Sequence, residues 1–304
     1  EIEAVIQSEE KNWAIQFEDQ SIIMLEWAER PDRVVLSSML GVPSEAMQLS
    51  VYEALLCYNL LWKDTGGVKM ALAGPGADLV LLAVPVAATQ TCLQAMRDAL
   101  SPDALLMDVG STKCDVIAAA QATLGDRLAC FVPAHPIAGK EVAGVEHADA
   151  QLYVQRQVFL TPLPETDARF TARARALWSV LGAQVRTLSP EAHDRAFAAV
   201  SHLPHLLAFA YIHGLMTQSD GEQLVSMGGP GFRDFSRIAA SDPTVWRDIL
   251  LVNRDEVLAQ LAHTRQALTV LEHAMSEGDG ARLHELIEAV RRFRSEWRMA
   301  SETD

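Results

Sequence analysis

The chain has 304 residues, of which 49% are hydrophobic and 21% are charged, so it can bury the cores of two ordinary domains and is not a disordered sequence. Its net charge of −15 at pH 7 argues against general binding to nucleic acids or to anionic membranes, since both carry negative charge. Four cysteines without a Cys-x-x-Cys pair favour a reducing, cytoplasmic compartment over a disulfide-stabilised fold.

Targeting and membrane segments are not predicted. The longest apolar run, residues 79–88, is too short to span a bilayer. No basic segment followed by an apolar core opens the chain, so we expect no secretory signal. The chain begins at Glu1 rather than at methionine, which indicates a fragment or a processed chain.

The first 77 residues predict a small α+β unit. Short apolar segments separated by polar or proline-containing turns indicate successive strands at residues 13–17, 22–27 and 34–36. Apolar residues at helical spacing then predict a helix over residues 44–62, which a Thr-Gly-Gly turn ends. A further strand is predicted over residues 68–73.

Residues 78–166 change to an alternating pattern. A continuous apolar run at residues 79–84 is typical of a strand that is buried on both faces. Strand and helix patterns then alternate, which predicts a parallel sheet with helices on its faces. The expected strands are 79–84, 104–109, 129–132 and 157–160, and the expected helices are 87–100 and 113–124.

From residue 167 to the end of the chain the pattern is nearly all helical. Helices are expected over residues 171–181, 190–217 and 243–275, with a kink at Pro204. Gly278 and Gly280 break the chain before a last helix. The two final helices carry apolar stripes that pack either across a two-fold axis or within one chain.

The beginning of the chain lacks a glycine-rich phosphate loop. Dinucleotide folds place G-x-G-x-x-G between the first strand and the first helix. Gly74-Pro-Gly76 supplies two of these glycines, but a strand follows it instead of a helix. The predicted fold class is therefore α/β, with an incomplete dinucleotide-binding parallel sheet between a small α+β segment and an all-helical domain.

Two predicted strand ends carry candidate site residues. His135 follows the strand at residues 129–132, where ligands bind in open α/β sheets, so it is a candidate base for a substrate hydroxyl. The alternative is a loop histidine that caps backbone groups. Gly110 permits a close backbone approach, and Ser111 lies at the site or simply caps the next helix. Lys113 either pairs with a carboxylate or is solvated.

Three histidines lie on the helix predicted over residues 190–217. His202 and His205 share a face because they are three residues apart, and His193 lies one turn or more before them. A metal site is a weak alternative, since no carboxylate third ligand accompanies them. We expect no metal and a polar cluster that lines a substrate pocket, with at least one histidine in the core.

Two arginines follow a glycine-rich turn. Arg233 and Arg237 suit the recognition of a small dianionic substrate through bidentate contacts with carboxylates. The alternative is an internal salt-bridge network with Asp234 or Asp242. Trp246 is expected to be a packing residue.

From about residue 77 to residue 299 the chain resembles prephenate dehydrogenase, the enzyme of tyrosine biosynthesis. The motifs that carry the resemblance are Ala77-Asp-Leu-Val-Leu-Leu-Ala-Val-Pro85, Asp108-Val-Gly-Ser-Thr-Lys113, His135-Pro-Ile-Ala-Gly-Lys-Glu141, His193-Asp194, Ser201-His-Leu-Pro-His205 and residues 231–246. The resemblance implies oxidative decarboxylation of prephenate to 4-hydroxyphenylpyruvate with NAD or NADP. It also implies a homodimer formed through the helical domain.

The resemblance further implies a role for single residues. His135 would be the catalytic histidine, and Ser111 would orient it near the nicotinamide. Arg237 would bind a substrate carboxylate. The remaining implied positions are His205 and His193 lining the substrate pocket, Glu141 and Arg233 shaping or gating it, and Val84, Pro85, Gly110 and Ser111 at the cofactor.

The first 77 residues resemble instead the small class I chaperones of type III secretion. The resemblance lies in residues 22–27, 34–40, 52–62 and 65–72. The expected domains are therefore 1–77, 78–166 and 167–304, with the first replacing half of a dinucleotide fold. Because the missing segment would bind the pyrophosphate, we expect weak cofactor binding. The alternatives are a non-enzymatic module that binds a secretion effector, an inactive chimera, and a metal-dependent hydrolase; prephenate and arogenate both remain possible substrates.

Overall fold

The computed structural model describes residues 2–9, 12–17, 22–28, 33–38, 79–84, 86–138, 149 and 151–297. The chain divides into two compact units, each of which is described by itself. The first comprises Glu1–Ala71 with Val142–Gln151, and the second comprises Leu72–Glu141 with Leu152–Asp304. The predicted helix at 44–62 and the predicted strand at 68–73 lie outside the described residues.

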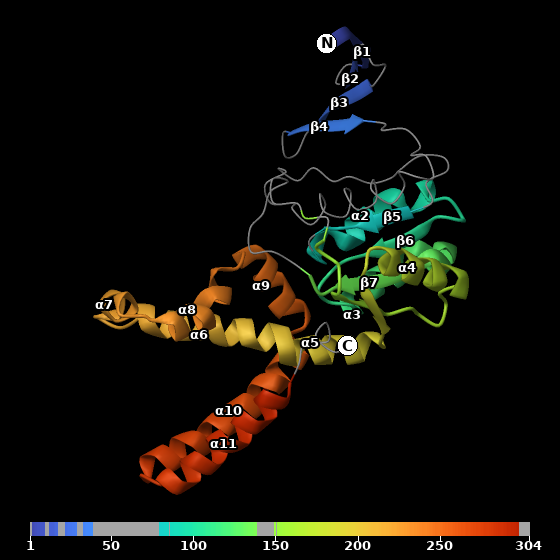
Figure 1. Ribbon diagram of the computed structural model, residues 1–304. Coiled ribbons are helices and arrows are strands. Elements are labelled where there is room, and N and C mark those ends of the chain that lie inside the picture. Colours follow the sequence, from blue (N-terminus) through green and yellow to red (C-terminus); the bar gives the residue numbers. More distant parts are fainter. Residues whose placement is uncertain are drawn as a thin grey trace. The chain divides into compact units, whose positions relative to one another are not determined.

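The first unit contains a four-stranded antiparallel sheet. Its strands β1 (Ile2–Glu9), β2 (Asn12–Phe17), β3 (Ile22–Ala28) and β4 (Arg33–Ser38) pair in chain order (Figure 1). The strands predicted at 13–17, 22–27 and 34–36 are confirmed. Strand β1 was not predicted. Its pairing with β2 shifts register twice, which interrupts the alternation of inward and outward side chains by which a strand is recognised.

The second unit is built on a five-stranded sheet in the order β5-β6-β7-β8-β9. Strands β5, β6 and β7 run parallel, β8 is antiparallel to β7, and β9 is parallel to β8. Every residue of β6 is buried, as expected of a strand covered on both faces. The strands are β5 (Leu79–Leu82), β6 (Leu105–Asp108), β7 (Phe131–Pro136), β8 (Gln157–Leu160) and β9 (Gln184–Thr187).

The alternating pattern is confirmed with three corrections. Strand β8 is antiparallel to β7, so the expected parallel sheet is not parallel throughout. The strand expected at 129–132 begins later, because residues up to Cys130 form a 3-10 helix. Strand β9 lies in a region that was predicted to be helical, and its single aliphatic residue, Val185, explains why no strand pattern was visible. The helices of this part are α2 (Thr89–Met96), α3 (Cys114–Leu124) and α4 (Ala168–Val180), of which α4 packs on β6, β7 and β8.

The rest of the second unit is helical. Helix α5 (Pro190–Phe197) continues through a π-helical turn (Ala198–His202) into α6 (Leu203–Met216). Pro204 is at the start of α6, so the expected interruption takes the form of this turn, since proline cannot donate a helical hydrogen bond. Short helices α7 (Gly221–Ser226) and α8 (Pro230–Ser236) and a 3-10 turn (Arg237–Ala240) follow.

Three longer helices end the described chain. The single helix expected over 243–275 is in fact α9 (Pro243–Val252) and α10 (Arg254–Ser276), because Asn253 leaves the helical conformation between them. Helix α11 (Gly280–Glu296) returns beside α10 after Gly278, whose φ of +66° favours glycine (Figure 1). None of the helices among the described residues is long and apolar enough to cross a membrane.

Candidate active site

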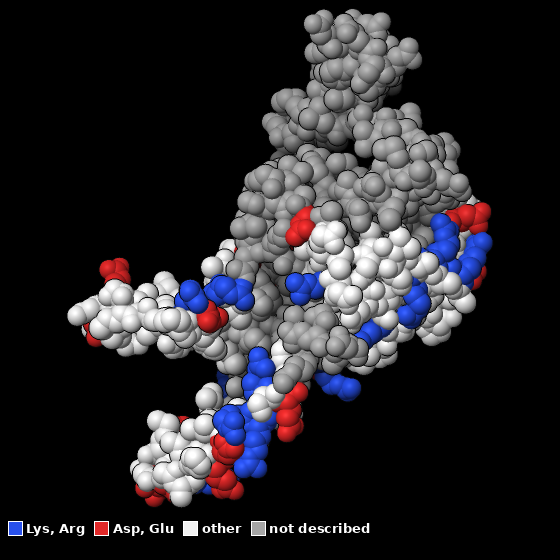
Figure 2. All heavy atoms as spheres, in the orientation of Figure 1, with Lys and Arg blue, Asp and Glu red and all other residues white. Residues whose placement is uncertain are grey.

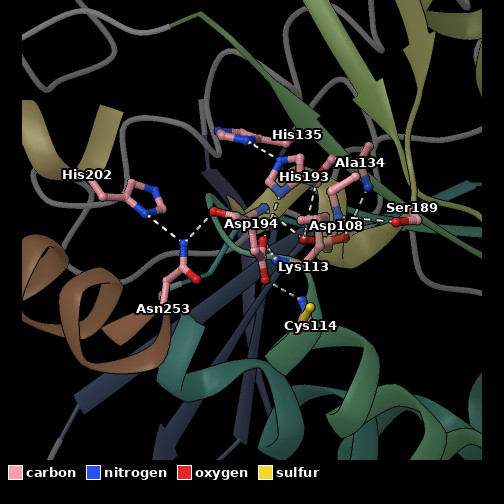
Figure 3. A network of polar contacts seen from close by, with 12 residues as sticks. Asp108, Lys113, Cys114, Ala134, His135, Ser189, His193, Asp194, His202 and Asn253 are labelled. Atoms are coloured by element: carbon pink, nitrogen blue, oxygen red, sulfur yellow. Dashed lines mark hydrogen bonds and ion pairs between the residues drawn. The ribbon is translucent and has the colours of Figure 1, made fainter. Parts of the chain in front are cut away.

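The site is a continuous set of polar contacts between the turn after β6, the end of β7, and helix α5 (Figure 3). A buried ion pair forms its base. The fully buried Lys113 ammonium donates to the Asp108 carboxylate and, at 2.7 Å, to the backbone oxygen of Ala134. Asp108 in turn accepts from the backbone N–H groups of Gly110 at 2.8 Å and Ala134 at 3.2 Å. These contacts tie the β6 turn to β7, the strand that carries His135.

Gly110 is required by this arrangement. A Cβ atom at this position would lie 3.0 Å from Oδ2 of Asp108, closer than an ordinary contact. A side chain would therefore push the carboxylate away from Lys113. The sequence left Lys113 either paired with a carboxylate or solvated, and in the structure it is paired with Asp108.

Asp194 connects α5 to the beginning of α3. Its two carboxylate oxygens accept from the backbone N–H groups of Lys113 and Cys114, each at 2.9 Å. No side chain next to α3 caps this helix, so a residue some 80 positions later satisfies its first N–H groups. Burial acts to raise the pKa of Asp194, but hydrogen bonds from His193, Cys114 and Lys113 outweigh it and lower that pKa.

His193 and His135 extend this contact into a chain of three side chains. Nδ1 of His193 lies 2.8 Å from Oδ1 of Asp194, and Nε2 of His193 lies 2.8 Å from Nδ1 of His135. A carboxylate only accepts, so His193 carries its proton on Nδ1 and its Nε2 accepts from His135. His135 then carries its proton on Nδ1, which leaves the lone pair of Nε2 to accept a proton from a ligand.

Both imidazoles of this chain are held neutral. Burial lowers the pKa of His135 well below its usual range, and the Lys113 ammonium lowers it further, as would any protonation of the neighbouring His193 or His202. Burial likewise lowers the pKa of His193, against the opposing effect of Asp194. His135 is half-buried whereas His193 is fully buried, so His135 is the member that can meet a ligand.

The other two histidines lie on the following turns. The buried His202 contacts Asn253, whose side-chain nitrogen is 3.0 Å from Nδ1 of His202. His205 donates from Nδ1 to the backbone oxygen of Ser201 at 2.9 Å and stacks on Trp246, with ring centroids 3.5 Å apart. Trp246 is thus a packing partner of a candidate site residue.

The structure brings some candidate residues together and leaves others apart. His135 and His193 are bonded, and His202 is close enough to affect the charge of His135. Among the described contacts, His193 rather than Ser111 holds Nδ1 of His135, so the orienting role of Ser111 stays a prediction. Ser111, Gly110 and Val84 are half-buried at the ends of β6 and β5. Pro85 and Glu141 lie outside the described residues.

The two arginines lie on the surface of the second unit. Arg233 and Arg237 are exposed on α8 and the turn after it, and basic side chains gather over α8 in the space-filling view (Figure 2). Arg233 pairs at 2.9 Å with its neighbour Asp234, which is the salt-bridge alternative. Their roles toward a substrate stay predictions.

Three residues that complete the site carried no assigned role in the sequence analysis. Asp194, Asp108 and Asn253 act through partners that are distant in sequence or through backbone groups. The His193-Asp194 pair was visible as a motif, but nothing in it shows that Asp194 caps α3. Within the described part of the chain there is no group of three metal-ligating side chains.

Comparisons with known proteins match two families to different parts of the chain. The model for the nucleotide-binding domain of prephenate dehydrogenase matches residues 59–187, and the model for the prephenate dehydrogenase dimerization domain matches residues 189–289. The Tir chaperone protein (CesT) family model matches residues 5–101. Both resemblances are thereby confirmed, and residues 59–101 are matched by both kinds of model.

Individual relatives match a large part of the chain. A cyclohexadienyl dehydrogenase of Zymomonas mobilis is 37% identical over 67% of this chain and 70% of the relative. A prephenate dehydrogenase of Bacillus subtilis is 31% identical over 72% of this chain but only 59% of the relative, so less than two thirds of that protein is matched. A solved prephenate dehydrogenase of Aquifex aeolicus, in complex with hydroxyphenyl propionate and NAD+, has a TM-score of 0.69 and 35% identity, with 77% of this chain and 84% of that chain covered.

Proposed function

Because this chain belongs to the prephenate dehydrogenase family, we propose that its second unit catalyses the oxidative decarboxylation of prephenate to 4-hydroxyphenylpyruvate. The observation that carries the proposal is the chain from Asp194 through His193 to His135, which leaves Nε2 of His135 as a proton acceptor. A neutral imidazole at the carboxyl end of a sheet strand is suited to general base catalysis.

His135 would take the proton of the ring hydroxyl. As that proton moves to Nε2, the hydroxyl carbon becomes a carbonyl and releases hydride. The bond to the ring carboxylate breaks, carbon dioxide departs, and its electron pair makes the ring aromatic as the carbonyl oxygen takes the proton back from His135. When bound, the nicotinamide of NAD or NADP supplies the hydride acceptor. Asp194 and His193 keep His135 in the productive tautomer, as a buried carboxylate does for a catalytic histidine elsewhere.

The residues present fit the nicotinamide end of such a cofactor. Val84, Gly110 and Ser111 are half-buried at the carboxyl ends of adjacent parallel strands, next to the strand of His135. The chain before β5 contains no G-x-G-x-x-G, so no such loop is available to hold the pyrophosphate. We therefore propose that cofactor binds through its nicotinamide side and with low affinity.

Substrate charge would be met by cationic groups. Arg237 is proposed to bind one carboxylate of prephenate, with His205 lining the pocket and Arg233 and Glu141 shaping its entrance. The net charge of −15 makes local positive charge necessary for an anionic substrate. Arogenate, which differs in its side chain, is the competing substrate, and NAD and NADP are both open.

A turnover assay tests the proposed function. Prephenate and arogenate are each supplied with NAD or NADP at millimolar concentration, and product formation is followed. We expect measurable turnover that His135→Asn lowers by about 10²–10⁴-fold, the usual contribution of a general base. The matched control is His213→Asn, since His213 is an exposed histidine of α6. Equal rates for His135→Asn and the parent chain would rule the proposal out.

We also propose that the chain forms a homodimer through its helical region. Large apolar side chains on α10 and α11 are exposed, and the matched family model is that of a dimerization domain. In Figure 2, most of the charged groups on the visible face of this hairpin gather along one side, and the other side is mostly uncharged. We propose a cytoplasmic location, because four cysteines without a Cys-x-x-Cys pair favour a reducing compartment.

A second function is proposed for the first unit alone. Its match to the CesT chaperone family supports a binding module for a secretion effector. A pull-down of the full chain with an unfolded effector segment tests this separately from turnover. Capture that competes with prephenate turnover would favour the module, whereas turnover without capture would favour the dehydrogenase alone.

A further inference from the structure

Asn253 connects the candidate active site to the long helix α10. It lies between α9 and α10, and its side chain is buried, with only 6% of the residue exposed. The side-chain nitrogen contacts two groups of the preceding helices, the backbone oxygen of Asp194 at 2.9 Å and Nδ1 of His202 at 3.0 Å (Figure 3). Neither contact is used in the mechanism described above.

These two contacts fix the position of a proton. The backbone oxygen of Asp194 can only accept, so the group of Asn253 that faces it is the NH₂. The second hydrogen of that NH₂ is directed at His202, whose Nδ1 must therefore accept and carry no proton. A neutral imidazole has one N–H, so the proton of His202 is on Nε2.

Building on the proposed function, we propose that Asn253 is a positioning residue that holds His202 as a neutral hydrogen-bond donor at Nε2. His135 has the opposite tautomer, with Nε2 as an acceptor. Asp194 determines both, since its carboxylate acts on His135 through His193 and its backbone oxygen orients Asn253. His135 would accept the hydroxyl proton, and the buried His202 would stay uncharged beside it, so that no further positive charge opposes protonation of His135.

The surroundings of His202 agree with a neutral state. Burial lowers the pKa of His202 to about 4, although Asp194 opposes this shift. Protonation would also place an N–H of His202 against the N–H of Asn253. Among the described residues, the groups that face His202 are His135 from β7, His193 and Asp194 from α5, His205 from α6, Trp246 from α9, and Asn253 itself.

Histidine NMR on the full chain tests the inference without requiring turnover. The ¹⁵N signals of His202, assigned by their loss in His202→Asn, report which nitrogen is protonated. We expect Nε2–H in the parent chain. In Asn253→Asp, which has the same shape but can only accept, we expect the proton to move to Nδ1 and the titration midpoint to rise to about 6.5 or above. Gln218→Glu is the matched control, since this exposed amide also donates to a backbone oxygen, that of Gly214.

Several outcomes would overturn the inference. A proton on Nδ1 of His202 in the parent chain contradicts it directly, even if Asn253→Asp fails to fold. An Asn253→Asp chain that folds with an unchanged tautomer and midpoint also contradicts it. Asn253→Ala removes the donor that faces Nδ1 of His202, so the Nε2–H form should no longer be the single tautomer, and a His202 that keeps it unchanged would contradict the positioning role. Absent turnover would defeat the proposed function but leave the tautomer result standing.

Discussion

Helix α5 and helix α11 have similar apolar and charged residues in sequence but opposite surroundings in the structure. In α5, the polar residues His193 and Asp194 are buried. Their side chains are hydrogen-bonded to each other, and Asp194 also accepts from the backbone of α3. In α11 no residue is buried, and Phe293 is 80% exposed. A buried position in this protein is therefore created by hydrogen bonds as much as by apolar character, and an apolar stripe alone marks a surface that still needs a partner.

The largest effect is expected at the buried ion pair of the site. Lys113→Met leaves the Asp108 carboxylate buried without its partner, which should lower the free energy of unfolding by about 3–5 kcal/mol. Denaturant unfolding measures this loss of free energy. The double variant Lys113→Met, Asp108→Asn should recover part of the loss, because no charge is then left buried. A single variant as stable as the parent would show that this pair does not hold the site together.

The buried histidines should make stability depend on pH. The pKa of His202 is lowered from 6.5 to about 4, so the unfolded chain binds a proton that the folded chain excludes. Stability is complete above about pH 6.5 and falls as the pH drops toward 4, by about 3 kcal/mol from this residue. His202→Gln should reduce the slope in unfolding experiments across this range. A free energy of unfolding that is constant or rises on acidification would contradict the burial of neutral histidines.

The exposed stripe of α11 should respond through assembly rather than folding. Phe293→Glu places a charge on the proposed dimer surface and removes about 2 kcal/mol of apolar burial per subunit. We expect a dimer dissociation constant raised at least tenfold in sedimentation equilibrium, with an unchanged monomer fold. Glu285→Gln, a polar change on the same helix, is the control. A parent chain that is monomeric, or a variant that dimerises equally well, would remove α11 from the interface.

The smallest effect is expected at the ion pairs on the surface of α11. Arg291 and Arg292 both contact Glu288, and their hydrogen bonds lower the pKa of Glu288 to about 2. Because both arginines are exposed and Glu288 is only half-buried, solvent screens these pairs, and Glu288→Gln should not change the unfolding free energy measurably. Carboxyl NMR titration checks the pKa. A clear loss of stability would show that charges on this hairpin are as important as those of the buried pair.

Much of the fold could be predicted from local patterns. Apolar periodicity and flanking glycine predict strand β8. They also predict both ends of α3 to within one residue. Strand β9 and the break at Asn253 could not be found in this way. Val185 gives β9 too little apolar character, and the leucines before and after Asn253 keep a helical spacing through the break. In both places tertiary contacts override the local pattern.

The site was only partly predictable for a different reason. His135 and His193 could be chosen because strand ends and family motifs mark them. The roles of Asp194 and Asn253 depend on partners 81 and 51 residues away, Lys113 and His202 respectively, and no spacing in the sequence records those contacts. Lys113 had two possible environments, and only the packing of β6 against β7 decides for the buried one.

The most direct test of this account is the protonation state of His135 and His193 at neutral pH. ¹⁵N spectra of the histidine-labelled full chain, assigned with His135→Asn and His193→Gln, show the proton of each ring. The Asp194–His193–His135 chain requires both imidazoles to be neutral, with protons on Nδ1 and a bare Nε2 on His135. An imidazolium at His135, or a proton on its Nε2, would mean that no base faces the substrate and that the proposed mechanism is wrong.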